Sequence, residues 1–160
     1  RGMKGSGKDE NKRAPRYGSK DGNAEGMCKG PADMDDFRMK FDSLEEQQED
    51  PDSIYNYVKQ VIRVRNQNPV IARGTTAYLE QYSGEQCFAL TRSYEGSNLL
   101  LLGNTSAEAV SVDLTGLTVG GTTAEELVLL GELYTGEETA ERAGTVVTLP
   151  AYSILILGEE

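Results

Sequence analysis

Q-C-F-A-L-T-R-S-Y-E-G-S-N-L-L-L-L-G, residues 86–103, carries the strongest structural signal in this sequence of 160 residues. Two runs, Gln86–Tyr94 and Asn98–Gly103, flank a Glu-Gly turn signal. Short runs bounded by turn residues in this way predict β-strands. Leu99–Leu102 is a continuous apolar run, which is typical of a strand buried between two layers. The segment therefore predicts two strands within a layered β-structure.

The same signals continue through residues 75–160. Short apolar runs alternate there with turn residues such as Gly120-Gly121 and Pro150, and Ile154–Leu157 is a second continuous apolar run. This punctuation predicts a mainly β fold, an antiparallel Greek-key β-sandwich. Besides the two strands above, we expect strands at Ala77–Tyr82, Val110–Leu114, Glu126–Tyr134, Val146–Leu149 and Ser153–Leu157.

One amphipathic helix is predicted over residues 51–67. Apolar residues recur there every three or four positions, which places them on a single stripe of a helix. The stripe consists of Ile54, Tyr57, Val58, Val61 and Ile62. Asp50 is the expected cap, with Pro51 at the first helical position. Residues 1–50 show no such periodicity, and they predict an irregular loop segment ahead of the helix.

The composition excludes several functional classes. Histidine is absent, which excludes a His-based triad, a His-ligated zinc site and an imidazole general base. Residues 74–160 carry thirteen Asp or Glu, two Arg and no Lys, a formal charge of −11. Such a charge repels phosphate backbones, and no apolar run approaches the roughly 20 residues that span a bilayer. We therefore expect neither a nucleic-acid nor a membrane partner.

The glycine-rich stretch G-M-K-G-S-G-K-D, residues 2–9, comes close to a phosphate-binding loop, G-x-x-x-x-G-K-[ST]. That loop needs a hydroxyl after the lysine to hold Mg²⁺, whereas this chain has Asp9 there. The loop should also open a helix, whereas polar residues here lead into Pro15. The sequence argues against nucleotide binding, and we expect no cofactor.

Two motifs surround the predicted helix. It ends in R-x-R-N-x-N-P-V, residues 63–70, and Gly2–Pro15 reads G-M-x-G-x-x-x-D-x-N-x-R-x-P. Together with the sandwich that follows, these motifs resemble the C-terminal part of an alpha-amylase-type glycoside hydrolase (glycoside hydrolase family thirteen). By this resemblance, residues 1–73 are the end of the catalytic (β/α)8 barrel, with the loop after strand eight and helix eight. Residues 74–160 are then domain C, the C-terminal β-sandwich.

The resemblance implies a retaining hydrolase of α-1,4-glucans such as starch and maltooligosaccharides. The catalytic carboxylates of the family lie on earlier barrel strands, upstream of Arg1, so no catalytic residue is assigned in this chain. By the resemblance, Asp9, Asn11 and Arg13 lie on the loop that borders the active-site mouth, which makes them substrate-adjacent. The alternative, which we favour, is that Arg13 pairs with a nearby acid and shapes the loop. No metal ligand is assigned, although calcium is an option in the full-length family. The compartment stays open, with a secreted or extracellular parent enzyme favoured.

Adjacent acidic pairs are the other candidates for catalysis. Neighbouring side chains point to opposite faces of a strand and diverge by about 100° on a helix. The pairs therefore predict solvated surface charge rather than a catalytic dyad. They are Asp35-Asp36, Glu45-Glu46, Glu125-Glu126 and Glu137-Glu138.

Several single residues have a structural and a functional interpretation. Five tyrosines could stack on sugars if exposed, but their strand positions favour core or rim. Asn104-Thr105-Ser106 matches a glycosylation sequon, and a turn is expected there instead. Cys28 and Cys87 are far apart and are expected to be separate thiols, with a disulfide left open. The five tyrosines are Tyr78, Tyr82, Tyr94, Tyr134 and Tyr152.

We therefore expect the C-terminal fragment of an alpha-amylase-type hydrolase, in which domain C stabilises the barrel and α-glucan binds through the missing barrel. The 160-residue chain by itself is expected to be inactive. The alternative is a stand-alone α-glucan-binding or interaction β-sandwich module. Self-association through the helix at residues 53–66 is a further option, because its apolar stripe needs cover.

Overall fold

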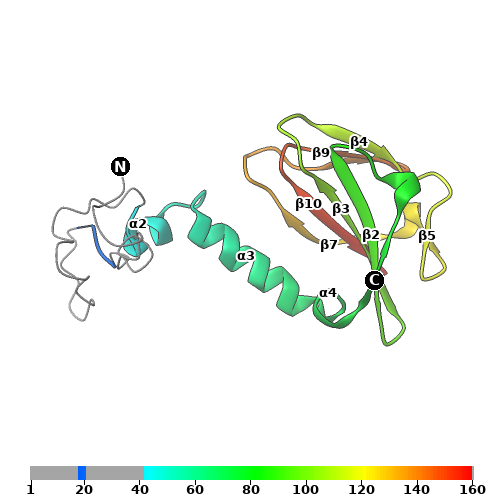
Figure 1. Ribbon diagram of the computed structural model, residues 1–160, viewed down its shortest axis with the longest axis horizontal. Coiled ribbons are helices and arrows are strands. Elements are labelled where there is room, and N and C mark those ends of the chain that lie inside the picture. The colour runs from blue at the N-terminus through cyan, green and yellow to red at the C-terminus, as the bar shows by residue number, and fades with distance from the viewer. Residues whose placement is uncertain (1–17, 21–41, 160) are drawn as a thin grey trace, which may run out of the picture. The chain divides into compact units, whose positions relative to one another are not determined.

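A computed structural model describes residues 18–20 and 42–159 (Figure 1). The chain divides into two compact units, Arg1–Asn56 and Tyr57–Glu160, with the boundary inside a helix. The predicted domain boundary between residues 73 and 74 stays a prediction.

The described part of the first unit holds a short helix, α2, at Leu44–Glu49. The Ser43 hydroxyl accepts a hydrogen bond from the Glu46 N–H at 3.3 Å, and the Glu46 carboxylate accepts one from the Ser43 N–H at 3.0 Å. This capping box satisfies backbone donors that a helix start otherwise leaves unpaired. The prediction of irregular structure up to residue 50 is therefore wrong for this segment.

Helix α3 spans Ile54–Gln67 and begins three residues later than predicted. Ser53 lies at its start, where the hydroxyl accepts a hydrogen bond from the Asn56 N–H at 3.2 Å. Asp50 ends α2 instead, because its N–H donates to the Glu46 carbonyl at 3.0 Å. The predicted cap at Asp50 is therefore wrong, since local hydrogen bonds engage this residue before α3 begins.

The second unit is the predicted β-sandwich, built entirely from antiparallel pairs. Its larger sheet has the strand order β1-β2-β3-β10-β7, and the smaller sheet has the order β4-β9-β8 (Figure 1). The larger sheet comprises β1 (Thr75–Tyr78), β2 (Cys87–Tyr94), β3 (Ser97–Asn104), β10 (Ile154–Gly158) and β7 (Val128–Leu133). The smaller sheet comprises β4 (Val110–Asp113), β9 (Val146–Leu149) and β8 (Glu141–Ala143), and a ribbon pairs β5 (Thr118–Val119) with β6 (Thr122–Thr123).

The main core fills the space between the two sheets. Leu100 and Leu102 of β3 lie there with Leu155 and Leu157 of β10, against Val147 of β9. Alternate residues of the same strands point to the opposite face. The continuous apolar runs therefore form strands that are apolar on both faces, as predicted.

A second apolar cluster lies on the outer face of the larger sheet. Helix α4, at Pro69–Arg73, places Val70 against Leu99 and Ile156 there. Val64 of α3 joins this cluster. The predicted apolar stripe on α3 is largely uncovered in the described residues. Three of its side chains are exposed, at 73% (Ile54), 46% (Val58) and 52% (Ile62) of their surface.

The strand predictions differ from the structure mainly at their ends. The strand expected at Ala77–Tyr82 stops at Tyr78, and a 3₁₀ helix, η1, occupies Glu80–Tyr82. Another 3₁₀ helix, η2, covers Ala124–Glu126 before β7. The short strands β5, β6 and β8 were not predicted, since two or three residues are too few to show an alternating pattern.

Candidate functional site

The predicted substrate-adjacent residues Asp9, Asn11 and Arg13 lie outside the described residues, as do Cys28 and the pair Asp35-Asp36. Their roles stay predictions. A candidate site in the described part must therefore come from other side chains.

In two of the three described acidic pairs one glutamate caps a helix start, and the third pair, Glu137-Glu138, lies exposed. Glu126 accepts hydrogen bonds from the Thr123 hydroxyl at 2.6 Å and the Thr123 N–H at 3.1 Å, and these bonds lower the pKa of the Glu126 carboxyl. Bonds from the Ser43 hydroxyl and N–H lower the pKa of Glu46 in the same way. A general acid needs a raised carboxyl pKa instead, so neither glutamate fits that role.

Within residues 18–20 and 42–159, no three His, Cys, Asp or Glu side chains gather as metal ligands. No helix in this part of the chain has the length and apolar character needed to cross a membrane.

Both arginines of the sandwich hold backbone carbonyls. Arg92 Nη2 donates to the Ile71 carbonyl at 2.7 Å, and Arg142 Nη1 donates to the Leu127 carbonyl at 2.6 Å. Arg142 also donates to the carbonyls of Ala124 and Gly144. With both guanidinium groups engaged in this way, the negative charge of the sandwich surface favours an uncharged ligand over an anion.

Three of the five candidate tyrosines are engaged within the fold. The Tyr82 hydroxyl donates to the Thr115 carbonyl at 3.2 Å. The Tyr134 hydroxyl donates to the Glu132 carboxylate at 2.7 Å and accepts from the Ala140 N–H at 3.0 Å. Burial is the main cause that raises the pKa of Tyr134. The Tyr94 ring lies under Arg73, whose Cζ is 5.9 Å from the ring centroid.

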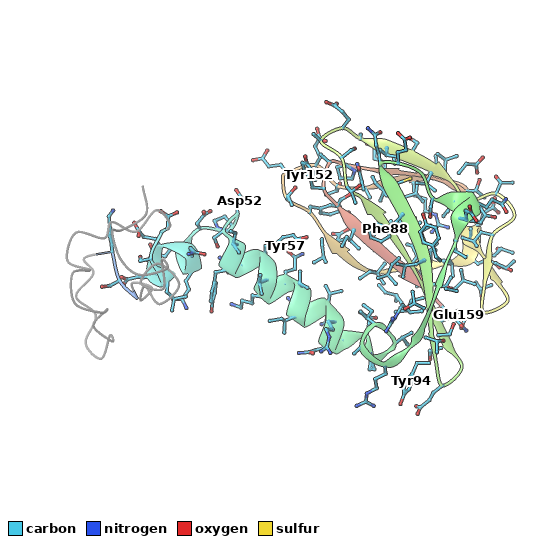
Figure 2. All side chains as sticks on the ribbon, in the orientation of Figure 1. Asp52, Tyr57, Phe88, Tyr94, Tyr152 and Glu159 are labelled. Atoms are coloured by element: carbon cyan, nitrogen blue, oxygen red, sulfur yellow. The ribbon has the colours of Figure 1, made fainter. Side chains whose placement is uncertain are left out.

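Tyr78 and Tyr152 are the two tyrosines of this set that face solvent, at 61% and 52% exposure. Tyr78 lies in the edge strand β1, with ordinary extended backbone. Tyr152 lies in the turn between β9 and β10 (Figure 2) and has a positive φ of 48°. The structure thus separates the five tyrosines into three that are engaged within the fold and two that are exposed, which the sequence could not do.

A buried asparagine holds the turn that carries Tyr152. Asn104 is 3% exposed, and its Nδ2 donates to the carbonyls of Leu149 at 3.1 Å, Pro150 at 2.9 Å and Glu108 at 2.7 Å. Its Oδ1 accepts from the Ser106 N–H at 2.9 Å. The turn predicted at the sequon is consistent with this, because Asn104 caps the Ser106 backbone two residues on.

Ser153 completes the support of this turn. Its hydroxyl is buried and donates to the Pro150 carbonyl at 2.7 Å, while the Tyr152 N–H donates to the Ser106 carbonyl at 3.1 Å. The role of Asn104 as the centre of this network was missed from the sequence. Its partners Leu149 and Pro150 are more than forty residues away along the chain, at separations of 45 and 46.

The fold as a whole matches a solved glycoside hydrolase. Eubacterium rectale Amy13B is 37% identical over 99% of this chain, with a TM-score of 0.84. The chain belongs to the alpha-amylase-type glycoside hydrolases. It spans 29% of the Amy13B chain, so it corresponds to a part of that enzyme.

Two further solved structures match a shorter part of this chain, with lower TM-scores. The alpha-amylase from H. orenii is 23% identical to this chain, with a TM-score of 0.57. The match covers 75% of this chain and 23% of the H. orenii chain. The trehalulose synthase MutB from Pseudomonas mesoacidophila MX-45 is 25% identical to this chain, with a TM-score of 0.56. The match covers 72% of this chain and 19% of the MutB chain. No protein-family model matches the sequence, and no curated protein does.

Proposed function

We propose that this chain is the C-terminal part of a retaining hydrolase of α-1,4-glucans, with its β-sandwich acting as domain C that stabilises the catalytic barrel. The observation that carries the proposal is the 37% identity to Amy13B over 99% of the chain. An alignment that covers nearly the whole chain at 37% identity supports a shared role more strongly than a shared fold alone does. The boundary of the two domains is proposed between residues 73 and 74.

The described residues support separate catalytic and supporting parts in the parent enzyme. The carboxylates of the described acidic pairs cap backbone groups or lie exposed, and a retaining glycosidase needs two carboxyl groups about 5 Å apart across the bond. The apolar side chains exposed on α3, Ile54, Val58 and Ile62, supply a surface that further polypeptide could cover. Catalysis is therefore assigned to the barrel and support to this chain.

A chimera tests the proposal. The segment of Amy13B that this chain matches is replaced by residues 1–160, and hydrolysis of soluble starch and maltoheptaose is compared with that of Amy13B itself. We expect the chimera to fold cooperatively and to release reducing ends at a rate within about tenfold of Amy13B, whereas the 160-residue chain alone releases none. A chimera that folds but is inactive, or a chain that hydrolyses starch alone, contradicts the proposal.

The exposed stripe on α3 supports a second candidate, a stand-alone interaction module that associates through this helix. Self-association would bury Ile54, Val58 and Ile62 between copies. Sedimentation of the chain over a hundredfold concentration range distinguishes the two cases. A dimer that Val58→Asp converts to a monomer, with Lys59→Asp as the matched control at a neighbouring exposed position, favours the second candidate.

A further inference from the structure

We propose that Tyr152, on the turn between β9 and β10, is a stacking platform for a pyranose ring of an α-glucan. The inference rests on the proposed function for its ligand class.

The backbone of Tyr152 has a conformation that its residue type disfavours. The left-handed region costs a residue with a Cβ about 1 kcal/mol, and a bulky residue there is an outlier. Among described non-glycine residues, Glu95 and Tyr152 have positive φ. Glu95 and Gly96 form the two-residue turn between the paired strands β2 and β3, where positive φ is required.

No hairpin explains Tyr152 in the same way. The strand before it, β9, pairs with β4 and β8, whereas the strand after it, β10, pairs with β3 and β7. The turn therefore crosses from one sheet to the other, and glycine would fit its geometry without cost. A strained backbone at an exposed aromatic residue favours a functional role for its side chain, because such strain is concentrated at functional sites.

The turn is rigid, which prepares the ring for binding. Asn104 and Ser153, at 3% and 1% exposure, both hold the Pro150 carbonyl, and Ser106 holds the Tyr152 N–H. A binding group fixed in advance loses little conformational entropy when the ligand arrives. The ring is thus presented by a fixed backbone rather than by a flexible loop.

The chemistry of the exposed side chain suits a neutral sugar. A phenol offers an apolar face and one polar end, and a pyranose offers an apolar C–H face edged by hydroxyls. Within the described residues the Tyr152 hydroxyl makes no hydrogen bond, unlike those of Tyr82 and Tyr134. The surrounding charge of −11 over residues 74–160 disfavours phosphorylated or acidic ligands.

Affinity electrophoresis of the 160-residue chain in gels containing glycogen tests the site. We expect wild type to be retarded, Tyr152→Asn to bind about five- to tenfold more weakly, and Tyr152→Phe to stay within about twofold of wild type. Tyr78→Ala is the matched control, because Tyr78 is equally exposed but unstrained, and it should bind as wild type does. An unretarded wild type, or equal retardation of Tyr152→Asn, overturns the proposal.

Thermal unfolding of the same variants separates binding from packing. Asparagine tolerates positive φ, so Tyr152→Asn should keep or raise the Tm while it loses binding. A fall in the Tm that accompanies the loss of binding would assign Tyr152 a packing role and overturn the proposal. The chimera with unmodified residues 1–160 tests the proposed function separately. A chimera that hydrolyses maltoheptaose while the wild-type chain runs unretarded overturns this site and leaves the proposed function standing.

Discussion

At the scale of single residues, the buried side chain of Asn104 connects three segments of the sandwich. One amide joins the end of β3, the following loop and the β9–β10 turn. The sequon pattern made Asn104 a candidate for glycosylation, but a side chain at 3% exposure with its amide already engaged cannot carry a glycan in this fold. Local sequence predicted the turn, and it could not predict the burial.

Asn104→Ala should lower the free energy of unfolding by about 2 kcal/mol, because it removes the three hydrogen bonds that this buried amide donates and leaves the Pro150 carbonyl with the Ser153 hydroxyl alone. Urea denaturation measures the change. Thr105→Ala is the control, since Thr105 is exposed, and it should cost about 0.5 kcal/mol or less. Equal effects of the two substitutions would show that the network contributes little.

Asp113 supplies a prediction for acidic pH. Hydrogen bonds from the Thr115 hydroxyl at 2.7 Å and N–H at 2.9 Å, and from the Thr145 hydroxyl, lower the pKa of the Asp113 carboxyl below 3.8. A lowered folded-state pKa stabilises the fold above the unfolded value and loses this contribution as the pH falls through the folded value. Asp113→Asn keeps an acceptor and removes the charge.

We therefore expect Asp113→Asn to have a lower Tm than wild type at pH 7, with the gap closing as the pH falls from about 4 toward 2. Differential scanning calorimetry at four pH values measures the gap. Glu125→Gln, at an exposed position within η2, is the control for general loss of negative charge. A gap that is unchanged at pH 2 would contradict the assignment.

At the scale of elements, one arginine fastens α4 to the sheet. Arg92 of β2 donates to the Ile71 carbonyl at 2.7 Å and the Val70 carbonyl at 3.5 Å, and it contacts the Thr76 hydroxyl of β1. A guanidinium can hold several acceptors at fixed angles, whereas an ammonium acts as a single point. The sequence predicted the helix at residues 51–67, but it predicted neither α4 nor the way α4 is joined to the sheet.

Arg92→Lys should not restore what Arg92→Ala loses, because the lysine head group cannot hold all three acceptors. Both variants should lose about 1–3 kcal/mol, and hydrogen exchange at the Gly74 N–H, which donates to the Val70 carbonyl, should quicken. Arg73→Ala removes only the exposed contact with Tyr94 and should cost about 0.5–1 kcal/mol. Full rescue by lysine would indicate a role of charge alone.

At the scale of the whole molecule, the charge of the sandwich is unbalanced. Residues 74–160 hold thirteen Asp or Glu and only two Arg, so the arginines offset two of the thirteen negative charges. Self-repulsion of like charges destabilises a compact state, and salt screens it over about 10 Å at 0.1 M. This property is set by composition and holds whichever partner the chain has.

Raising NaCl from 10 mM to 300 mM should increase the Tm by about 3 °C, which corresponds to about 1 kcal/mol for a domain of this size. Thermal unfolding followed by circular dichroism measures the shift. The double variant Glu137→Gln, Glu138→Gln removes two exposed charges and should respond less to salt. A Tm that falls with NaCl would mean that repulsion is not the dominant electrostatic effect.

The sequence by itself determined the β-sandwich, the helix before it and the family, because these follow from apolar runs, turn residues and motifs that lie within a few positions of one another. Only the tertiary structure decided which residues could act. It buried Asn104, engaged Tyr82, Tyr94 and Tyr134, and left Tyr152 exposed on a strained turn. The physical reason is that exposure and hydrogen bonding depend on partners distant in the chain, as with Asn104 and Pro150, and no local pattern encodes such partners.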